Sequence, residues 1–247
     1  MTLSNRTTRE RLDRSPRVAA VVVAGGSGER FGAPGGKQLA EVEGVPVLGH
    51  ALGAFLRASS VSEIVVVVHP ERVEEYRARA VAPLGDSVPV MVVAGGDTRL
   101  QSVANGLAAV SRDADVIAVH DGARPLVMPA TIDEAVAALI ERQVDGVVVG
   151  HPSYDTVKLV DGVRVTGTAD RTRFWVAQTP QVFDARVLRT AYERALAEGY
   201  SGTDDASLVE RIDGVVEMLE GPRENIKVTV AEDLDFVAAV LRHRKEA

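Results

Sequence analysis

The sequence contains no cysteine, few aromatic residues and no long apolar run. Without cysteine the chain forms neither disulfide bonds nor thiolate metal sites, and this fits a cytoplasmic location. Because no apolar stretch approaches membrane-spanning length, we expect no membrane partner. Acidic residues outnumber basic ones, and the formal net charge of −7 argues against a nucleic-acid partner, since such proteins present a basic face.

Aliphatic residues are abundant instead. Hydrophobic residues make up 46% of the 247 residues while aromatics make up 4%, so we expect an interior of Val, Ala and Leu. Residues 1–17 mix arginines with acids and lack a hydrophobic signal core, which predicts a disordered tail. A transit peptide is the alternative, although such peptides avoid acids. The absence of repeats and linkers predicts one domain over residues 18–247.

The most informative stretch is a strand followed by a glycine-rich loop. Residues 18–24 form an unbroken apolar run that is typical of a buried parallel strand. The run ends at Gly25-Gly26-Ser27-Gly28, and the cations Arg30 and Lys37 follow. Glycine lets the backbone approach a ligand closely, so we interpret the loop as a phosphate cradle. A glycine-rich turn with two solvated cations is the alternative.

Two familiar phosphate loops do not fit this stretch. A Walker loop needs one more residue before its lysine than residues 32–37 provide, and Gln38 offers no hydroxyl for magnesium. A dinucleotide fingerprint needs a third glycine, and this chain has Phe31 at that position. The fingerprint also needs an acidic residue after the second strand, which binds the ribose. That strand, residues 64–68, ends on His69 instead. An NAD-dependent oxidoreductase is therefore the least favoured interpretation.

The alternation of strand-like and helix-like segments predicts an α/β fold with a doubly wound, mostly parallel sheet. We expect strands at 18–24, 64–68, 88–94, 116–120, 147–149 and 215–219, and helices at 46–57, 98–110, 129–142, 184–198, 203–212 and 232–243. Ligands bind at the carboxyl ends of such strands. Polar residues suited to phosphates follow three of them, at 25–37, 96–102 and 121–124, so we expect these segments to converge on one site.

After Gly150 the pattern changes to two short β-like runs around Asp161-Gly162, a strong hairpin signal. An isolated two-stranded ribbon is marginal in water, so we expect this arm, at about residues 152–168, to pack on a partner subunit. Packing within the same chain is the alternative. The only tryptophan, Trp175, follows the arm, and we expect it in the core.

The glycine-rich loop resembles the A-A/G-G-x-G-x-R…K-Q signature of nucleotidyltransferases that activate sugar and polyol phosphates. With the motifs AGGSGER, HDGARP, TDDASLVE and NIKVT, the stretch from Val18 to Phe236 is similar to the 2-C-methyl-D-erythritol 4-phosphate cytidylyltransferase family of the non-mevalonate isoprenoid pathway. The resemblance implies a Rossmann-like nucleotidyltransferase fold, a homodimer held by the arm, and an enzyme that joins CTP and 2-C-methyl-D-erythritol 4-phosphate and releases pyrophosphate.

The resemblance also implies residue roles. It implies catalytic roles for Arg30, Lys37, Arg171 and Lys227, CTP binding by Ala24, Gly25, Gly26, Gly28, Gly96, Asp97 and Ser102, and binding of the polyol phosphate by Arg124, Thr156 and Thr203. We assign Mg²⁺ to Asp121, because a carboxylate ends a buried strand there and Mg²⁺ takes one or two carboxylates plus phosphates. Asp121 as a turn cap and Asp97 as a helix cap are the alternatives. Lys227, between Ile226 and Val228, is expected in an apolar strand with its ammonium group in the site.

Three glycines depart from the family pattern. Gly25 and Gly122 replace alanines, and Gly36 stands where proline usually precedes Lys-Gln, which predicts a looser loop. A ribitol 5-phosphate cytidylyltransferase is the nearest rival function, since it shares the CTP machinery. A non-catalytic nucleotide-binding regulator is the rival from a different class, although a regulator does not need Asp121, Arg30 and Lys37 together.

Overall fold

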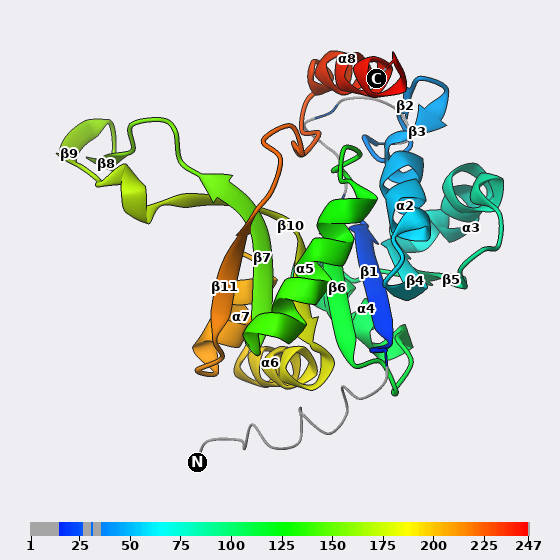
Figure 1. The fold of residues 1–247 in the computed structure, drawn as a ribbon, viewed down its shortest axis with the longest axis horizontal. Coiled ribbons are helices and arrows are strands. Elements are labelled where there is room, and N and C mark those ends of the chain that lie inside the picture. Colours follow the sequence, from blue (N-terminus) through cyan, green and yellow to red (C-terminus); the bar gives the residue numbers. More distant parts are fainter. Residues whose placement is uncertain (1–14, 27–30, 32–35, 247) are drawn as a thin grey trace.

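The computed structural model describes residues 15–26, 31 and 36–246, and their core is a seven-stranded sheet (Figure 1). In sheet order the strands are β11 (Val216–Glu220), β7 (Gly146–Pro152), β10 (Trp175–Asp184), β6 (Val116–Asp121), β1 (Val18–Ala24), β4 (Val61–Val68) and β5 (Val90–Ala94). All neighbours pair in parallel except β10, which runs antiparallel to both β6 and β7. The predicted α/β fold with a mostly parallel sheet is confirmed.

Helices cover both faces of this sheet, which explains why its strands are continuous apolar runs. On β1, Ala20 and Val22 belong to the core cluster under α2 (Val47–Arg57) and α5 (Pro129–Arg142). Ala19 and Val21 face the opposite cluster, under α4 (Arg99–Ala109), α6 (Ala185–Glu198) and α7 (Asp205–Arg211). Successive residues of a strand point to opposite faces, so both layers need apolar side chains.

Side-chain caps set where the helices near the sheet edge begin. Thr98 and Gln101 form a capping box at α4, and Asp184 accepts hydrogen bonds from the first turn of α6. Asp204 caps α7: its side chain accepts from the backbone N–H of Ser207. Because Thr98 caps α4, the alternative role of Asp97 as its cap is wrong.

The remaining elements are short, apart from the last helix. They are β2 (Glu41–Val42), β3 (Val45–Pro46), the 3₁₀ helices Pro70–Arg72, Ala82–Leu84 and Arg171–Arg173, α3 (Val73–Tyr76), the π-helix Arg77–Val81 and α8 (Asp233–Glu246). Val237 of α8 packs in a third apolar cluster with Phe31, Val42 and Leu126. None of the described helices has both the length and the apolar character needed to cross a bilayer.

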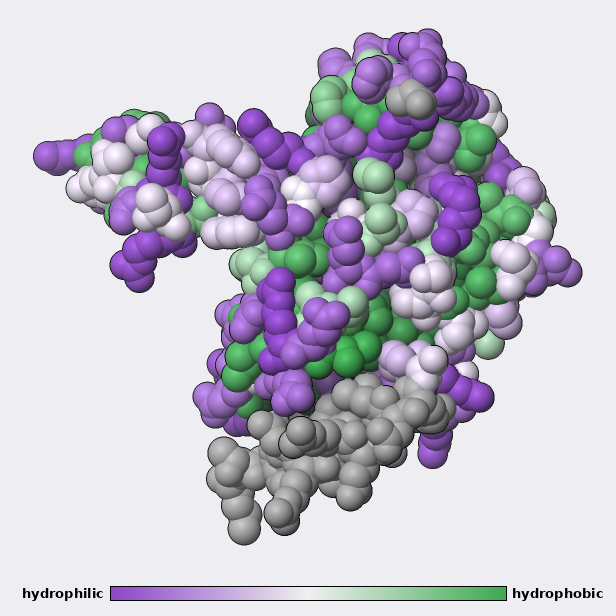
Figure 2. Space-filling model, viewed as in Figure 1, coloured by the Kyte–Doolittle hydropathy of each residue, from purple (hydrophilic) through white to green (hydrophobic). Residues whose placement is uncertain are grey.

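The arm projects from the body (Figures 1 and 2) and consists of β8 (Lys158–Asp161) and β9 (Arg164–Thr168). Gly162 in its turn has a φ of 58°, a left-handed conformation that suits glycine. Several of its apolar side chains are exposed, including Leu159 and Val165 at 53% and 55%. The division into a tail at 1–17 and a domain at 18–247 stays a prediction, and residues 1–14 lie outside the described residues.

Two sequence-based expectations need correction, and one strand was missed. Trp175 is 38% exposed at the start of β10 and does not belong to the core. The strand β10 was not predicted, because its Gln-Thr-Pro-Gln segment lacks an apolar run. Lys227 does not lie in a strand: residues 225–229 have no regular secondary structure, although the backbone N–H of Val228 donates to the carbonyl of Ala123 at 2.8 Å.

Candidate functional site

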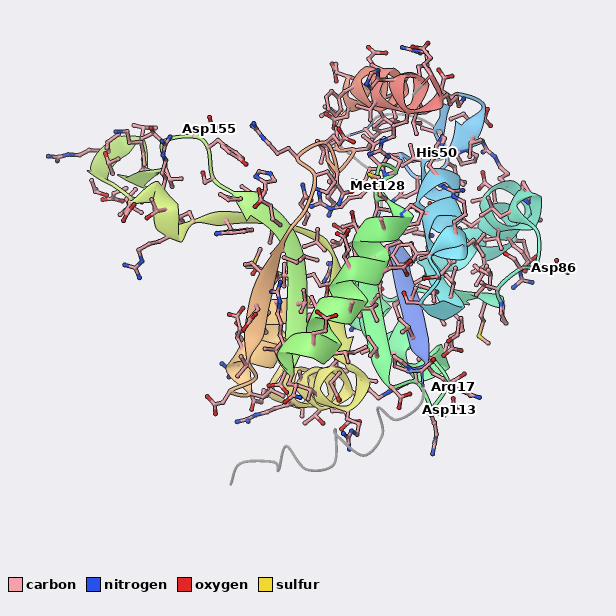
Figure 3. The ribbon with its side chains drawn as sticks, in the orientation of Figure 1. Arg17, His50, Asp86, Asp113, Met128 and Asp155 are labelled. Atoms are coloured by element: carbon pink, nitrogen blue, oxygen red, sulfur yellow. The ribbon has the colours of Figure 1, made fainter. Side chains whose placement is uncertain are left out.

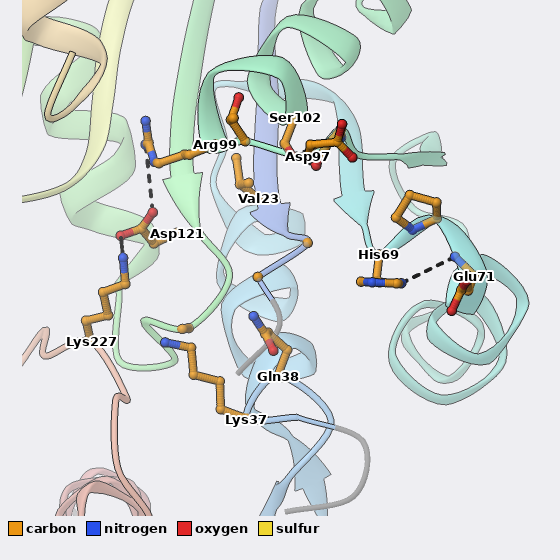
Figure 4. A pocket seen from close by; sticks show the side chains of 16 residues that line it. Val23, Lys37, Gln38, His69, Glu71, Asp97, Arg99, Ser102, Asp121 and Lys227 are labelled. Carbon is orange, nitrogen blue, oxygen red and sulfur yellow. Dashed lines mark hydrogen bonds and ion pairs between the residues drawn. The ribbon is translucent and has the colours of Figure 1, made fainter. Parts of the chain in front are cut away.

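A pocket of about 740 Å³ lies where β1, β4, β5 and β6 end (Figure 4). Its size suits a small-molecule ligand. It is lined by Val23, Gly25, Gly26, Lys37, Gln38, His69, Pro70, Glu71, Gly96, Asp97, Thr98, Arg99, Ser102, Asp121, Ala123 and Lys227. Described residues from all three segments that we expected to converge at the strand ends therefore line one pocket.

Asp121, the last residue of β6, is surrounded by cations. Lys227 Nζ lies 2.9 Å from its Oδ2, Arg99 Nη2 lies 3.8 Å from its Oδ1, and Arg124 Nε lies 3.7 Å from Oδ2. In Figure 4, Arg99 and Lys227 reach the carboxylate from opposite sides. Burial by itself raises the pKa of Asp121, but these cations, Lys227 foremost, outweigh burial and lower the pKa to about 2. The carboxylate is therefore ionised at neutral pH.

A chain of hydrogen bonds beneath Asp121 fixes its backbone. The backbone N–H of Asp121 donates to Thr179 Oγ1 at 3.0 Å, and Thr179 Oγ1 lies 2.9 Å from His120 Nδ1. The carbonyl of Arg124 can only accept, so Nε2 of the neutral His120 ring carries the hydrogen and donates to it at 3.2 Å. Nδ1 therefore accepts from the hydroxyl of Thr179. Complete burial lowers the pKa of His120 to about 4, so the ring is neutral.

Arg124 connects Asp121 to the segment that carries Lys227. Its side chain is 12% exposed, and Nη1 donates to the carbonyl of Asn225 at 2.8 Å. The buried amide of Asn225 in turn donates to the carbonyl of Thr179 at 2.9 Å. Arg124 thus lies near Asp121 but is not part of the pocket wall, where the sequence-based assignment as a substrate ligand would place it.

The loop after β5 is held by Ser102. Its hydroxyl accepts a hydrogen bond from the backbone N–H of Gly96 at 3.1 Å, while Gly95 N–H donates to the carbonyl of Val68 at 2.8 Å. A Cβ atom on Gly96 would lie 2.5 Å from the Cβ of Gln101, so this position requires glycine. Asp97 is exposed between these anchored residues and lines the pocket.

The glycine-rich loop is described only in part. Gly25 and Gly26 line the pocket after Ala24, which ends β1 and is buried. The predicted ligands Gly28 and Arg30 lie outside the described residues. Lys37 lines the pocket, and the preceding Gly36 has a φ of 69°, a conformation that proline cannot adopt. Glycine rather than the family's usual proline is therefore compatible with the backbone conformation at this position.

The predicted substrate residues Thr156 and Thr203 and the predicted catalytic residue Arg171 do not line the described pocket either. Thr156 and Thr203 are exposed, and Thr156 follows Asp155, which lies on the segment that leads from β7 to the arm (Figure 3). Arg171 is exposed in a 3₁₀ turn, and its Nη1 donates to the carbonyl of Tyr154 at 3.0 Å.

Arg99, His120 and Thr179 were not predicted as site residues from the sequence. Arg99 follows the helix cap Thr98 and has the appearance of an ordinary first-turn residue. His120 directly precedes Asp121 at the end of a buried strand, and that position was its only signal. Thr179 belongs to β10, which periodicity did not detect, so nothing in the sequence linked it to Asp121.

The donor set fits a metal ion that arrives with a phosphate ligand. Among the residues that the structure describes, no group of three or more His, Asp or Glu side chains could hold a metal ion by itself. Asp121 offers one ionised carboxylate at the pocket, and Mg²⁺ commonly binds one or two carboxylates together with substrate phosphates. The site therefore suits a metal–nucleotide complex better than a resident metal.

Comparisons with known proteins identify the family of the chain. The profile of the 2-C-methyl-D-erythritol 4-phosphate cytidylyltransferase family matches residues 18–243. The proteins of that name from Geotalea uraniireducens and Acidobacterium capsulatum are each 42% identical to the chain; the matches cover 92% of this chain and 97% and 98% of those proteins, respectively.

Solved structures match over similar lengths. The 4-diphosphocytidyl-2C-methyl-D-erythritol synthase of Anaerococcus prevotii superimposes with a TM-score of 0.81 at 30% identity, covering 93% of this chain and all (100%) of that one. The 2-C-methyl-D-erythritol 4-phosphate cytidylyltransferase of Thermus thermophilus gives 0.73 at 28% identity, with 92% and 99% covered. On this evidence, the chain belongs to the 2-C-methyl-D-erythritol 4-phosphate cytidylyltransferase family of nucleotidyltransferases.

Proposed function

We propose that the pocket around Asp121 transfers the cytidylyl group of CTP to 2-C-methyl-D-erythritol 4-phosphate. A phosphate oxygen of the acceptor forms a bond to the α-phosphorus of CTP, and the bond between the α-phosphorus and the bridging oxygen breaks to release pyrophosphate. The products are 4-diphosphocytidyl-2-C-methyl-D-erythritol and pyrophosphate. The observation that carries this proposal is the ionised Asp121 carboxylate between Lys227 and Arg99, at a strand-end pocket that the glycines also line.

Phosphoryl-type transfer needs positioning and cations more than a protein nucleophile. The attacking phosphate is already an anion, so the described residues need not remove a proton from it. We assign to Lys37 and Lys227 the stabilisation of the negative charge that builds up on the phosphates. Arg30 keeps the same assignment as a prediction from the sequence.

The pocket offers two kinds of contact for CTP. Gly25 and Gly26 present backbone at the end of β1, where N–H groups bind phosphate oxygens. The Gly96–Ser102 loop presents backbone groups and Asp97, which suit the amino and carbonyl groups of cytosine. We therefore assign the triphosphate to the first segment and the base and ribose to the second.

We assign Mg²⁺ to Asp121, together with phosphate oxygens of CTP. When bound, the ion would neutralise part of the phosphate charge and act as a Lewis acid toward phosphate oxygens. Asp121 Oδ2 is paired with Lys227 at 2.9 Å, whereas Oδ1 is 3.8 Å from Arg99 and beyond hydrogen-bond distance. Oδ1 is therefore the oxygen that we assign to the ion.

We further propose a homodimer in the cytoplasm, in which the arm of each subunit packs on the other. The exposed apolar residues of β8 and β9 support this, because a two-stranded ribbon gains stability only by packing. Thr156 and Arg171 lie on or beside the arm, away from the pocket of their own chain. In the dimer, we assign them and the exposed Thr203 to the acceptor phosphate.

Pyrophosphate release from CTP and Mg²⁺ tests the function, with 2-C-methyl-D-erythritol 4-phosphate and ribitol 5-phosphate offered in parallel. We expect release with the methylerythritol substrate. Release with ribitol phosphate alone would contradict the assigned acceptor and retain the CTP site. CTP binding without release from either acceptor would support a regulator instead.

A further inference from the structure

A second carboxylate lies behind the pocket and holds one of its cations. Asp205, the first residue of α7, is completely buried. Arg99 donates to both of its oxygens, from Nη1 to Oδ1 at 2.9 Å and from Nη2 to Oδ2 at 2.6 Å. The hydroxyl of Tyr192 on α6 also donates to Oδ1. A two-point contact of this kind fixes both the position and the plane of the guanidinium group.

The same guanidinium group faces Asp121. Arg99 lines the pocket, and its Nη2 lies 3.8 Å from Asp121 Oδ1, which is too far for a hydrogen bond (Figure 4). A shift of about 1 Å would bring these atoms to the usual distance of a charge-assisted hydrogen bond. In that position Arg99 would occupy the oxygen that we assign to the metal ion.

We propose that Asp205 is a positioning residue that holds Arg99 back from Asp121, so that Oδ1 of Asp121 stays available to a divalent cation. This inference rests on the proposed function, in which Asp121 binds Mg²⁺ with CTP. Asp205 competes successfully for Arg99 because its contact is shorter and uses both oxygens. Asp205 is shielded from water, so no water molecule can replace Arg99 as its partner. Losing Arg99 would therefore leave the Asp205 carboxylate buried and unpaired, which is energetically costly.

Strand β10 sets the spacing between the two carboxylates. Gln181 donates from Nε2 to Asp204 Oδ2 at 2.8 Å and accepts from the backbone N–H of Ala206 at 3.0 Å, so the first turn of α7 is attached to β10. Thr179 of the same strand accepts from the backbone of Asp121. Asp205 and Asp121 are therefore both anchored to one strand, and Arg99 lies between them with a defined preference for Asp205.

Direct metal binding tests this inference without relying on turnover. Mn²⁺ binding in the presence of CTP is measured by electron paramagnetic resonance for the wild type, Asp205→Asn, and the double variant Arg99→Met/Asp205→Asn. In Asp205→Asn the two-point acceptor is lost and Arg99 is free to approach Asp121, so we expect about ten-fold weaker Mn²⁺ binding, in the range seen when a residue behind a metal ligand is changed. Removing Arg99 as well is expected to restore affinity to within about two-fold of the wild type, because the two changes act through one contact.

Asp133→Asn is the matched control. Asp133 accepts hydrogen bonds from Ser59 and Ser60, outside the pocket lining, so its variant removes a bonded carboxylate without touching Arg99. We expect a lower melting temperature and wild-type Mn²⁺ affinity. If Asp205→Asn does not fold, the test rests on the double variant Arg99→Met/Asp205→Asn. Weak Mn²⁺ binding by the folded double variant would overturn the inference.

Asp121→Asn separates this inference from the proposed function. Wild-type affinity in Asp205→Asn, with binding lost in Asp121→Asn, would overturn the role of Asp205 and leave the metal assignment intact. Wild-type affinity in Asp121→Asn would overturn both. Weak binding in Asp205→Asn, restored in the double variant and lost in Asp121→Asn, is the result that the structure predicts.

Discussion

Lys227 Nζ lies 2.9 Å from Oδ2 of Asp121, although the two residues come from distant parts of the sequence. The contact depends on the hydrogen bond from Val228 N–H to the Ala123 carbonyl and on Arg124, which binds the Asn225 carbonyl. Lys227 is therefore held at the pocket by the turn that follows Asp121. One pair of residues thus joins the end of the sheet to the irregular segment before α8.

Replacing Lys227 by methionine should remove the positive charge that we assign to the substrate phosphates. It should also break the ion pair between Lys227 and Asp121. We expect kcat to fall by about 10²- to 10³-fold, the cost of losing one preorganised charge-stabilising group. Steady-state kinetics with saturating CTP and acceptor measure this. Lys245→Met, which changes an exposed lysine near Glu43, is the control, and an equal loss there would contradict the assignment.

Ser102→Ala should loosen the loop that we assign to the base. The hydroxyl of Ser102 accepts from Gly96 N–H, and a neutral hydrogen bond contributes about 1 kcal/mol. We expect the KM for CTP to rise about five-fold while kcat stays close to that of the wild type, since the loop binds ground state and transition state alike. A fall in kcat at constant KM would show that the loop acts on the reacting phosphates instead.

His120 predicts a loss of stability in mild acid. Burial lowers its pKa to about 4 in the folded protein, whereas unfolded histidine titrates near about 6.5, so the unfolded chain alone gains a proton as pH falls between these values. The contribution of His120 to the free energy of unfolding is fully present above the pKa of the unfolded histidine. About 2 kcal/mol of it is lost between pH 7 and pH 5.

Urea unfolding at the two pH values measures that loss, with His120→Asn as the comparison. Asparagine does not titrate in this range, so the variant should start less stable at pH 7 and should lose less stability on acidification. Equal losses in both proteins would contradict a buried, neutral His120. Asp121 contributes little to this comparison, because its lowered pKa affects stability only below about pH 4.

The arm predicts a subunit interface. Leu159→Glu with Val165→Glu places charges on exposed apolar positions of β8 and β9, and we expect a monomer by light scattering coupled to size-exclusion chromatography. CTP binding should persist, since the pocket residues that we assign to CTP lie outside the arm, while turnover should fall with the loss of Thr156 and Arg171. A dimer that resists both substitutions would contradict the interface.

The sequence predicted most of the fold because buried parallel strands have an obvious signal. The helix predicted at 129–142 matches α5 at both ends, and the runs at 18–24 and 116–120 match β1 and most of β6. In contrast, β10 is an antiparallel strand with polar residues at the sheet centre, where Thr179 and Gln181 serve hydrogen bonds rather than apolar packing.

The site was predictable only where motifs are local. The glycine loops, Asp121 and Lys227 stand in short recognisable segments, and the pocket brings their described residues together. The pair of Arg99 and Asp205 was not predictable, because it joins the first residues of two helices that the sequence separates widely. Trp175 was assigned to the core from residue type alone, but it lies at the exposed start of β10, next to the arm.

The most direct test of the account is pyrophosphate release from CTP and 2-C-methyl-D-erythritol 4-phosphate as Mg²⁺ is varied, for the wild type and Asp121→Asn. Asparagine keeps the size of the side chain but removes the charge that we assign to the metal ion. We predict Mg²⁺-dependent release by the wild type and a loss of at least about 10²-fold in the variant. Wild-type rates in a folded Asp121→Asn protein would contradict the central role of this carboxylate.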